Sequence, residues 1–276
     1  MEKIYVVLAG LPGKMATVTV SHLLKDERFN VIQKALTGPD ISESSVTIDG
    51  TEILLVKPED HESFLSEMKV NFLYDFIVID YSHLSAVNCN AELYCKLDIP
   101  FVMGTTGGDR AILKKTVENS NTCAVIAPNM AKQIVGFQAM VEYASINFPN
   151  LFDGYSLEIT ESHQKAKADT SGTAKSMVGY FKKLGVFFEI SQIKKIRNRF
   201  VQILKGIPFK SLKGHGWHTY KLKSEDGSVL FKFTHNVNGR DVYVLGTIDA
   251  VLFLSGKIEL MTIGKCFSMI DVLKGK

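Results

Sequence analysis

The first 126 residues alternate short apolar, β-rich runs with helical stretches. The apolar runs lie at residues 4–9, 31–36, 53–56, 76–80, 101–103 and 123–126, and the helical stretches lie at 14–24, 59–68, 85–97 and 110–119. Strands that alternate with helices in this way are typical of a parallel sheet covered by helices. The alternation therefore predicts an α/β domain of the Rossmann type in the amino-terminal half.

The character of the sequence changes after Pro128. We expect helices at 132–147 and 174–184, a strand at 155–161, antiparallel strands at 217–222, 229–235 and 242–248, and a final helix at 247–258. The Glu-Asp-Gly triplet at 225–227 predicts a hairpin turn. Residues 1–130, completed by 246–276, are thus expected to form one domain, and residues 131–245 an α+β domain with a mixed or antiparallel sheet.

The charge of the chain is unevenly distributed. In total 32 basic residues face 29 acidic ones, but between Glu161 and Lys223 there are 14 Lys or Arg against 3 Asp or Glu. Because the basic residues carry no aromatic interleaving or groove-reading motif, nucleic acid is not the expected partner. The local excess instead indicates a surface that faces small anions.

The four cysteines show no paired C-x-x-C spacing, which excludes a disulfide framework or a zinc site and predicts buried free thiols; they are Cys89, Cys95, Cys123 and Cys266. No apolar run approaches the ~18 residues of a membrane helix, so no membrane partner is expected. The first residues lack the pattern of a signal peptide. A cytoplasmic protein is expected, with an organelle left open if a targeting segment is missing from this sequence.

A glycine-rich segment, GLPGKMA at 10–16, follows the first predicted strand and begins the first helix. Its pattern G-x-x-G-x-x-A is a variant of the dinucleotide fingerprint, in which the backbone and a helix amino terminus approach the pyrophosphate. The alternative is an ordinary tight turn. Its position in an alternating series favours nucleotide binding by this turn.

The end of the second predicted strand bears on the choice of cofactor. The fingerprint expects an acidic residue there to hold the ribose 2′-hydroxyl of NAD, whereas residues 35–38 read Ala-Leu-Thr-Gly. With no carboxylate beside Thr37 to repel a 2′-phosphate, and with Lys14 and Lys34 in the same region, we expect NADPH to be preferred. NADH remains the alternative, because Asp40 lies close by in the sequence.

Two further turns follow later strands of the same predicted sheet. They read GTTGG at 104–108 and APNM at 127–130. Loops at the carboxyl edge of a parallel sheet line its ligand crevice. Both turns are therefore expected at the ligand crevice, near the nicotinamide ring of the cofactor.

The densest set of reactive side chains lies at 161–175. The unperturbed pKa of a histidine side chain lies near neutrality, so His163 is a candidate proton donor or acceptor, and Lys167 supplies a positive charge. Ser171, Gly172 and Thr173 stand where a helix begins, so their hydroxyl and N–H groups can bind a carboxylate. A helix cap alone would need neither the histidine nor the lysine.

Other candidates have simpler explanations. We expect His215 and His218 to be structural, residues 194–199 to be a solvated basic run, and the aromatic residues at 181–188 to lie in the core or at a subunit interface. Arg240 has two equal interpretations, a ligand contact or a subunit contact. None of these residues stands at a spacing typical of metal ligands, and no metal is predicted.

In combination the motifs at 10–15, 102–107, 127–130 and 163–174 resemble those of the 4-hydroxy-tetrahydrodipicolinate reductases, also called dihydrodipicolinate reductases. The resemblance continues through 235–240 and 247–254 and is nearest to the plant-type branch. It implies an NAD(P)H-dependent reductase of the diaminopimelate and lysine pathway, whose second domain binds a small cyclic dicarboxylate and forms a homotetramer.

The resemblance also implies roles for single residues. His163 matches the proton donor, Lys167 the lysine that holds a substrate carboxylate, and Ser171, Gly172 and Thr173 the site of the other carboxylate. The resemblance also implies which residues bind the nucleotide: Gly10, Gly13, Lys14 and Met15, with Gly104, Thr106 and Asn129 near the nicotinamide end. Gln164 stands where bacterial members have a second histidine, and the loop Ala168-Asp169-Thr170 is shorter and lacks their proline. These departures are similar to the plant-type branch.

Two rival functions stay open at this point. The first is a non-catalytic relative that keeps the nucleotide site as a scaffold or assembly factor, and the second is another NAD(P)-dependent oxidoreductase, such as an amino-acid dehydrogenase. The presence of His163 and Lys167 argues against the first. The Ser-Gly-Thr context at 171–173 argues against the second.

Overall fold

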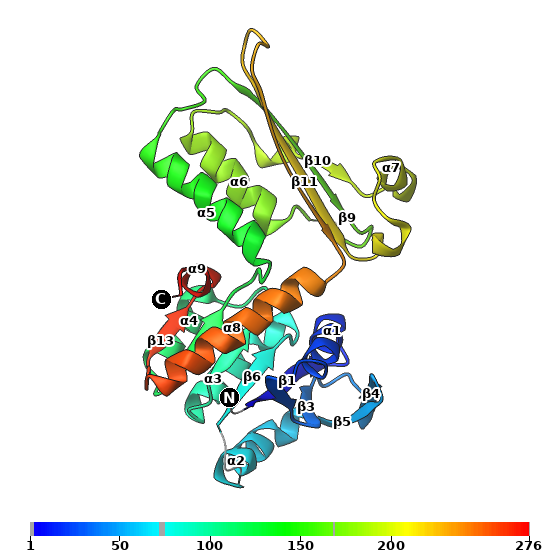
Figure 1. The fold of residues 1–276 in the computed structure, drawn as a ribbon, viewed down its shortest axis with the longest axis vertical. Coiled ribbons are helices and arrows are strands. Elements are labelled where there is room, and N and C mark those ends of the chain that lie inside the picture. Colours follow the sequence, from blue (N-terminus) through cyan, green and yellow to red (C-terminus); the bar gives the residue numbers. More distant parts are fainter. Residues whose placement is uncertain (1–2, 72–74, 168, 276) are drawn as a thin grey trace. The chain divides into compact units, whose positions relative to one another are not determined.

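The structure is a computed structural model that describes residues 3–71, 75–167 and 169–275. It divides into two compact units, one of Met1–Lys132 with Tyr243–Lys276 and one of Gln133–Val242, which Figure 1 shows in sequence colours. The sequence predicts a division after residues 130 and 245. Ala168 of the predicted site loop lies outside the described residues.

The first unit contains a largely parallel sheet. Its strands run in the order β13-β8-β7-β6-β1-β3-β5-β4, and β2 also pairs with β1; they are β1 (Ile4–Leu11), β2 (Phe29–Val31), β3 (Lys34–Thr37), β4 (Ser45–Ile48), β5 (Thr51–Val56), β6 (Phe76–Asp80), β7 (Phe101–Met103), β8 (Cys123–Ile126) and β13 (Lys265–Phe267). Only β4 pairs antiparallel, with β5, among the described strands of this sheet. The predicted Rossmann-type sheet is confirmed, although the run at 31–36 is divided between β2 and β3, and the sequence does not predict β4 and β13.

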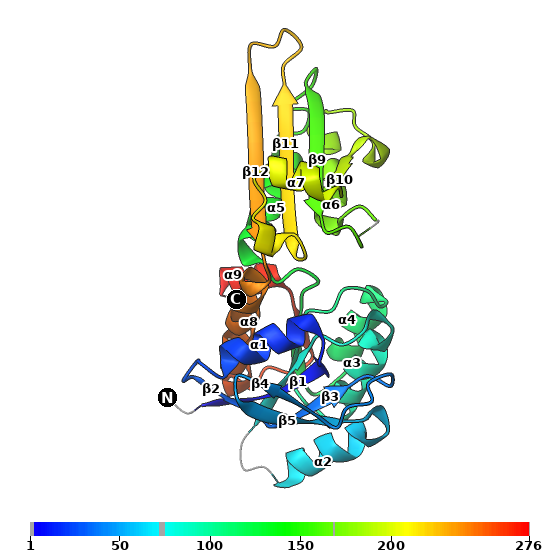
Figure 2. The same ribbon diagram turned by 90° about the vertical axis from the view of Figure 1, so that its right-hand side faces the viewer.

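Helices cover both faces of this sheet, as Figure 2 shows. They are α1 (Lys14–Leu23), α2 (His61–Asn71), α3 (Val87–Lys96), α4 (Arg110–Glu118), α8 (Asp241–Glu259) and α9 (Met269–Lys274). Leu65, Tyr94 and Leu113, on α2, α3 and α4, share one buried cluster with Val78 and Phe101 of the sheet. The carboxylate of Asp109 accepts the N–H groups of Ala111 and Ile112 and so defines where α4 begins.

The predicted strand at 242–248 is wrong, because these residues form the first part of α8. Val244, Ile248 and Val251 are buried at helical spacing. A Cβ atom at Gly246 would overlap the carbonyl oxygen of Met130, so the helix lies directly against that backbone. The β-branched composition favours a strand locally, but burial of one helical face outweighs that preference.

The second unit is built on a mixed sheet of four strands. Its elements are α5 (Lys132–Asn147), β9 (Ser156–His163), α6 (Gly172–Lys183), β10 (Lys194–Ile196), α7 (Arg199–Leu204), β11 (His215–Lys223) and β12 (Leu230–Asn238). The order is β10-β9-β11-β12, with β10 parallel to β9 and the other pairs antiparallel. The α+β class is as predicted, whereas the sequence does not predict β10 and α7.

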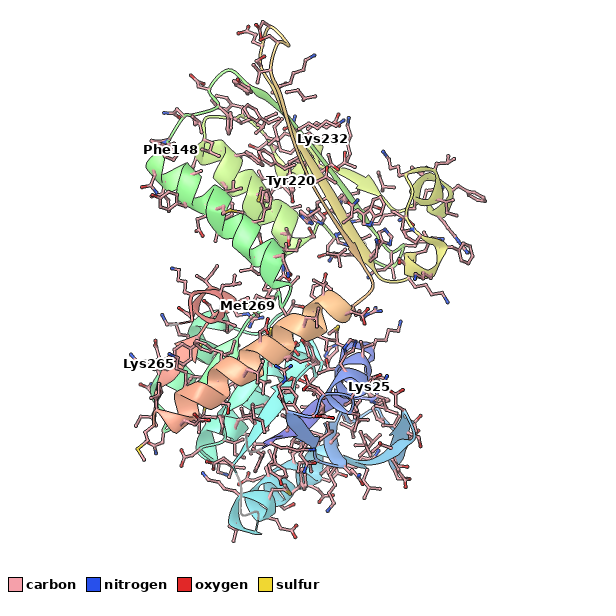
Figure 3. The ribbon with its side chains drawn as sticks, in the orientation of Figure 1. Lys25, Phe148, Tyr220, Lys232, Lys265 and Met269 are labelled. Atoms are coloured by element: carbon pink, nitrogen blue, oxygen red, sulfur yellow. The ribbon has the colours of Figure 1, made fainter. Side chains whose placement is uncertain are left out.

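The core of this unit lies between the sheet and the helices α5 and α6, which cover one face of the sheet (Figure 1). Ile159, Tyr220 and Leu222 of the sheet belong to one buried cluster with Met177 and Phe181 of α6. Figure 3 shows Tyr220 among the side chains on this side of the sheet. Of the aromatic residues at 181–188, Phe181 and Phe188 are core residues, but Phe187 is 97% exposed.

The prediction that the four cysteines are buried free thiols has a mixed outcome. Cys95 and Cys123 are buried free thiols and Cys266 is half-buried, but Cys89 is exposed, so the prediction is wrong for Cys89. Cys89 lies on the solvent side of α3, whereas Cys95 faces the sheet.

Within the described ranges, no helix has the length and apolar character needed to span a bilayer.

The contact of α8 with Met130 generates a test. Replacing Gly246 with Ala should lower the free energy of unfolding by about 2–3 kcal/mol, because the added methyl group has no room against the Met130 carbonyl. Gly256 lies on the same helix, and among the described residues no atom comes within 4 Å of the place that its methyl group would take. Gly256→Ala should instead stabilise by up to about 1 kcal/mol. Urea unfolding measures both, and equal effects would contradict the proposed packing.

Candidate active site

The glycine turn of the first unit leaves backbone N–H groups open at the start of α1. Gly10 has a positive φ of 103°, and a Cβ there would overlap the carbonyl oxygen of Tyr81. The N–H of Gly13 donates to the carbonyl of Gly10 over 2.8 Å. As the N-cap of α1, Gly13 offers no side-chain cap to the first turn. A helix start of this kind binds a phosphate group.

The neighbours of this turn have supporting tasks. Ala16, in the third position of the fingerprint, is fully buried where α1 packs on the sheet. The hydroxyl group of Thr37 donates to the carbonyl of Leu11 over 2.6 Å, and only 4% of Thr37 is exposed. Thr37 therefore holds the turn in shape through its side chain, rather than offering that hydroxyl to a ligand.

The two later turns follow adjacent strands at the same sheet edge. Met103 pairs with Ile126, so Gly104 and the loop that contains Asn129 leave the sheet side by side. A Cβ at Gly104 would overlap the ring of Tyr81. Thr106 is exposed, while the Asn129 side-chain oxygen accepts the N–H of Ala131 over 3.0 Å. The expected nicotinamide-end residues thus share the carboxyl edge of the sheet.

The lysines expected beside the nucleotide differ in position. Lys14 is exposed in the first turn of α1. Lys34 is the first residue of β3, at the opposite end of that strand from Thr37, and its ammonium group lies 5.6 Å from the ring centre of Phe64. Lys14 is therefore suited to contact a phosphate at the turn, and the suggested contribution of Lys34 is not supported.

In the second unit, strand alternation brings the reactive residues to one face. Glu161 and His163 lie two apart on β9, and His218 and Tyr220 lie two apart on β11, so each pair shares a face of the sheet. His218 pairs with Glu161 across the strands, and Gly216 pairs with His163. A Cβ at Gly216 would lie 3.1 Å from Cε1 of His163, so the glycine makes room for the imidazole ring.

Glu161 is the buried anion of this site. It is fully buried, and its Oε1 lies 2.5 Å from Nη2 of Arg197. Its Oε2 accepts the N–H of Ser171 over 3.1 Å. Arg197 also donates from Nε to the carbonyl of Lys167 over 2.6 Å. The prediction of a solvated run at 194–199 is therefore wrong for Arg197, which ties the site loop to the carboxylate.

Three imidazole rings gather beside this carboxylate. Nε2 of His163 lies 3.1 Å from Nε2 of His218, and Nδ1 of His163 lies 3.2 Å from the carbonyl oxygen of His215. Nδ1 of His218 lies 3.0 Å from the hydroxyl of Tyr220, and the ring of His235 stacks on His218 with centroids 4.8 Å apart. The sequence predicts a structural role for His218, but this placement brings it into the site.

Burial controls the protonation of these rings. It lowers the pKa of His163 to about 4, an effect that the nearby Glu161 carboxylate opposes and that Arg197 and Lys167 reinforce. Burial also lowers the pKa of His218 well below its ordinary value, with His235 and His163 acting in the same direction. The cluster is therefore neutral at pH 7 in the unliganded protein.

The start of α6 carries three residues that the sequence predicts to bind an anion. Ser171 is its N-cap, and the Ser171 hydroxyl accepts the N–H of Ala174 over 3.1 Å. Gly172 is exposed and Thr173 is half-exposed. Lys167 forms an ion pair with exposed Asp169 at 3.2 Å. The hydroxyl of Ser171 caps the helix and also lies 3.4 Å from Nε2 of His218. The Lys167 side chain is 28% exposed.

Three further sequence candidates have definite surroundings. Gln164 is half-buried beside His163. His215 bonds to the hydroxyl of Ser162 at 2.9 Å and to the carbonyl of Ser211 at 3.2 Å, which is a structural role as expected. The guanidinium of Arg240 packs across Gly214, 3.0 Å from the position of its missing Cβ.

The site contains one cluster with metal-ligand chemistry. Ligand atoms of Glu161, His163 and His218 lie within 4.8 Å of one another. However, both oxygens of Glu161 already accept hydrogen bonds, from Arg197 and Ser171. The half-buried guanidinium of Arg197 neutralises the carboxylate charge that would attract a cation. We assign no metal to this cluster.

The fold defines an oxidoreductase that has a Rossmann-type unit and a second unit of the α+β class. Family models of the dihydrodipicolinate reductase N-terminus and C-terminus match residues 4–130 and 134–273. The chain belongs to the dihydrodipicolinate reductase family.

Similar proteins agree with this assignment. The chain is 44% identical over 263 residues to "Probable 4-hydroxy-tetrahydrodipicolinate reductase 1, chloroplastic" of Oryza sativa subsp. japonica, covering 95% of this chain and 76% of that protein. It is 44% identical over 272 residues to "4-hydroxy-tetrahydrodipicolinate reductase 2, chloroplastic" of Arabidopsis thaliana, covering 98% and 77%. The predicted resemblance to the plant-type branch is confirmed.

A solved structure shows the same fold. The dipicolinate-bound dihydrodipicolinate reductase of Paenisporosarcina sp. TG-14 superimposes with a TM-score of 0.65 and covers 96% of this chain and 97% of that one. The sequence identity between the two chains is 20%. The two chains therefore share the fold at this low sequence identity.

The buried histidines predict acid sensitivity of the second unit. Burial lowers the pKa of His163 and of His235 to about 4 in the folded protein. Between pH 6.5 and about 4 these two rings are therefore protonated in the unfolded chain but neutral in the folded protein. The contribution of the two neutral rings to the free energy of unfolding is complete above pH 6.5. It is lost as pH falls, at up to about 1.4 kcal/mol per pH unit for each ring. His235→Phe should therefore flatten the fall in unfolding free energy between pH 7 and 5. Parallel curves for variant and wild type would contradict this account.

Proposed function

We propose that this chain reduces 4-hydroxy-tetrahydrodipicolinate to tetrahydrodipicolinate with a nicotinamide cofactor, as a step of diaminopimelate and lysine biosynthesis. The observation that carries the proposal is the anion site of the second unit, where Lys167 and the start of α6 stand beside a neutral buried imidazole, His163. Family membership supports the same reaction. A scaffold would need no such combination.

A dicarboxylate needs two separate cationic or amide-rich positions. One carboxylate is assigned to the N–H groups of Gly172 and Thr173, which begin α6. The other is assigned to the ammonium group of Lys167, which would exchange exposed Asp169 for the substrate. Gln164, half-buried next to His163 in the chain, is suited to hydrogen-bond the substrate.

His163 is assigned as the proton donor. In the unliganded protein the positive charges of Lys167 and Arg197 help to lower the pKa of His163. A bound dicarboxylate offsets these charges and raises the pKa of the imidazole, so that substrate binding favours the protonated form of His163. Protonation is thereby linked to the presence of the substrate.

The residues of the first unit fit a dinucleotide. Gly10, Gly13, Lys14 and Met15 surround an uncapped helix start, and Gly104, Thr106 and Asn129 share the same sheet edge. Such a cofactor supplies the hydride when it is bound. The proposal prefers NADPH, because the end of β3 carries no carboxylate and Lys14 lies in the turn. Thr37 is assigned to hold that turn.

Two properties of the intact protein stay predictions. A homotetramer is proposed on family grounds, and the face of the mixed sheet opposite α5 and α6, with half-exposed Trp217 and Thr219 on β11, is suited to meet another copy. The sequence predicts the cytoplasm as the location. The two plant relatives are named chloroplastic, so an organelle remains the alternative.

The decisive experiment follows NADPH absorbance with the product of the preceding synthase as substrate. Wild type should turn over. His163→Ala should lower kcat by about 10²–10⁴-fold because the general acid is lost. Lys167→Ala should mainly raise KM, by about 10–100-fold, because a charge-assisted contact to a carboxylate is lost. Lys115→Ala, at an exposed lysine in the last turn of α4, serves as the control.

The same assay tests the alternatives. Intact nucleotide binding without turnover would favour the scaffold and refute the proposed reaction. Turnover with a higher kcat/KM for NADH than for NADPH would refute the cofactor preference while leaving the reaction in place.

A further inference from the structure

His218 stands far from His163 in the sequence but beside it in space. The residue directly after His163 in the sequence is Gln164, whose side chain does not titrate. A second imidazole nevertheless contacts His163, with 3.1 Å between the two Nε2 atoms. It comes from β11, 55 residues further along the chain.

The hydrogen bonds around the two rings define their tautomers. A carbonyl oxygen only accepts, so Nδ1 of His163 carries the proton that bonds to the His215 carbonyl. In the neutral ring Nε2 of His163 is then bare and accepts, which makes Nε2–H of His218 the donor. Nδ1 of His218 is bare in turn and accepts the hydroxyl proton of Tyr220. The neutral acid of the site therefore has no proton of its own on Nε2.

We propose that His218 is a positioning residue for His163, which sets its tautomer and shares one proton with it between the two Nε2 atoms. This inference rests on the proposed reduction. When the pair takes up a proton from water, both rings carry Nδ1–H, and the proton between them is the one that His163 gives to the substrate ring. The pair is then neutral, and water supplies the next proton.

The surroundings favour a singly charged pair over two separate charges. The charged or titratable groups facing the rings are Glu161, Lys167, Arg197, His215, Tyr220 and His235. Glu161 Oε2 lies 4.0 Å from Nε2 of His163 and stabilises one positive charge. His235 stacks on the far side of His218, and both of its buried ring nitrogens lack a hydrogen-bond partner in the described part of the chain. A second charge would have no counter-ion among these groups.

Two substitutions at 218 separate hydrogen bonding from packing. His218→Phe keeps a flat ring against His235 but cannot bond to His163. His218→Asn loses the ring but keeps an amide that can donate to, or accept from, Nε2 of His163. If His218 positions and shares the proton, Asn should retain more activity than Phe. If His218 only packs, Phe should retain more than Asn.

The expected values follow from that logic. His218→Phe should lower kcat by about 10–100-fold with KM within about threefold, and shift the high-pH limb of the kcat profile to lower pH by about one unit. His218→Asn should recover at least half of that loss on a logarithmic scale. Lys115→Ala, at an exposed lysine in the last turn of α4 in the first unit, should keep the wild-type profile.

An NMR titration of the unliganded protein gives a readout that does not depend on turnover. Nitrogen shifts of His163 should show the Nδ1–H tautomer in wild type, and a lower pKa in His218→Phe than in wild type. An unchanged His163 pKa together with Phe more active than Asn would overturn the role of His218. If wild type lacks turnover, the proposed reaction fails, while the NMR result still decides whether the two rings share a proton.

Discussion

The ion pair between Glu161 and Arg197 is the contact on which the second unit's site depends. Both oxygens of this fully buried carboxylate are occupied, one by the guanidinium at 2.5 Å and one by the N–H of Ser171 at 3.1 Å. A buried ion pair contributes modest net stability, but the loss of one partner leaves an unpaired charge in the interior. The pair therefore specifies the arrangement more than it stabilises it.

Its consequences reach every group that the proposed reaction needs in this unit. Glu161 accepts the N–H of Ser171 at the start of α6, and Arg197 donates to the carbonyl of Lys167 and so holds the loop to which this lysine belongs. It also supplies the negative charge beside His163 that opposes the effect of burial on the pKa of that ring. The Glu161 carboxylate thus contacts the start of α6 directly and the loop of Lys167 through Arg197, and it lies beside His163.

The sequence predicts the first unit well because its information is local. Strands at 76–80, 101–103 and 123–126 coincide with β6, β7 and β8, and the glycine turn follows β1. The failure at 242–248 has a tertiary cause, since local β propensity there competes with a helical face that α8 buries. No pattern within the segment reveals the backbone of Met130 that Gly246 meets.

The site shows the same boundary between local and long-range information. His163, Lys167 and the Ser-Gly-Thr element stand close together in sequence and can be proposed from it. Arg197 and His218 cannot, because their roles depend on the register of β9 with β10 and β11, which pairs Glu161 with Lys195 and with His218. Alternation within β9 and β11 is the available signal, but it assigns faces without assigning partners.

A double-mutant cycle at the central ion pair tests this account most directly. Glu161→Gln and Arg197→Met should each lower the unfolding free energy by about 3–5 kcal/mol, because each leaves a partner buried and unpaired. The double variant should lose less than the sum by about 2–3 kcal/mol, the coupling expected of groups in one buried network. Strict additivity of the two losses in urea unfolding would contradict the claim that the pair organises the site.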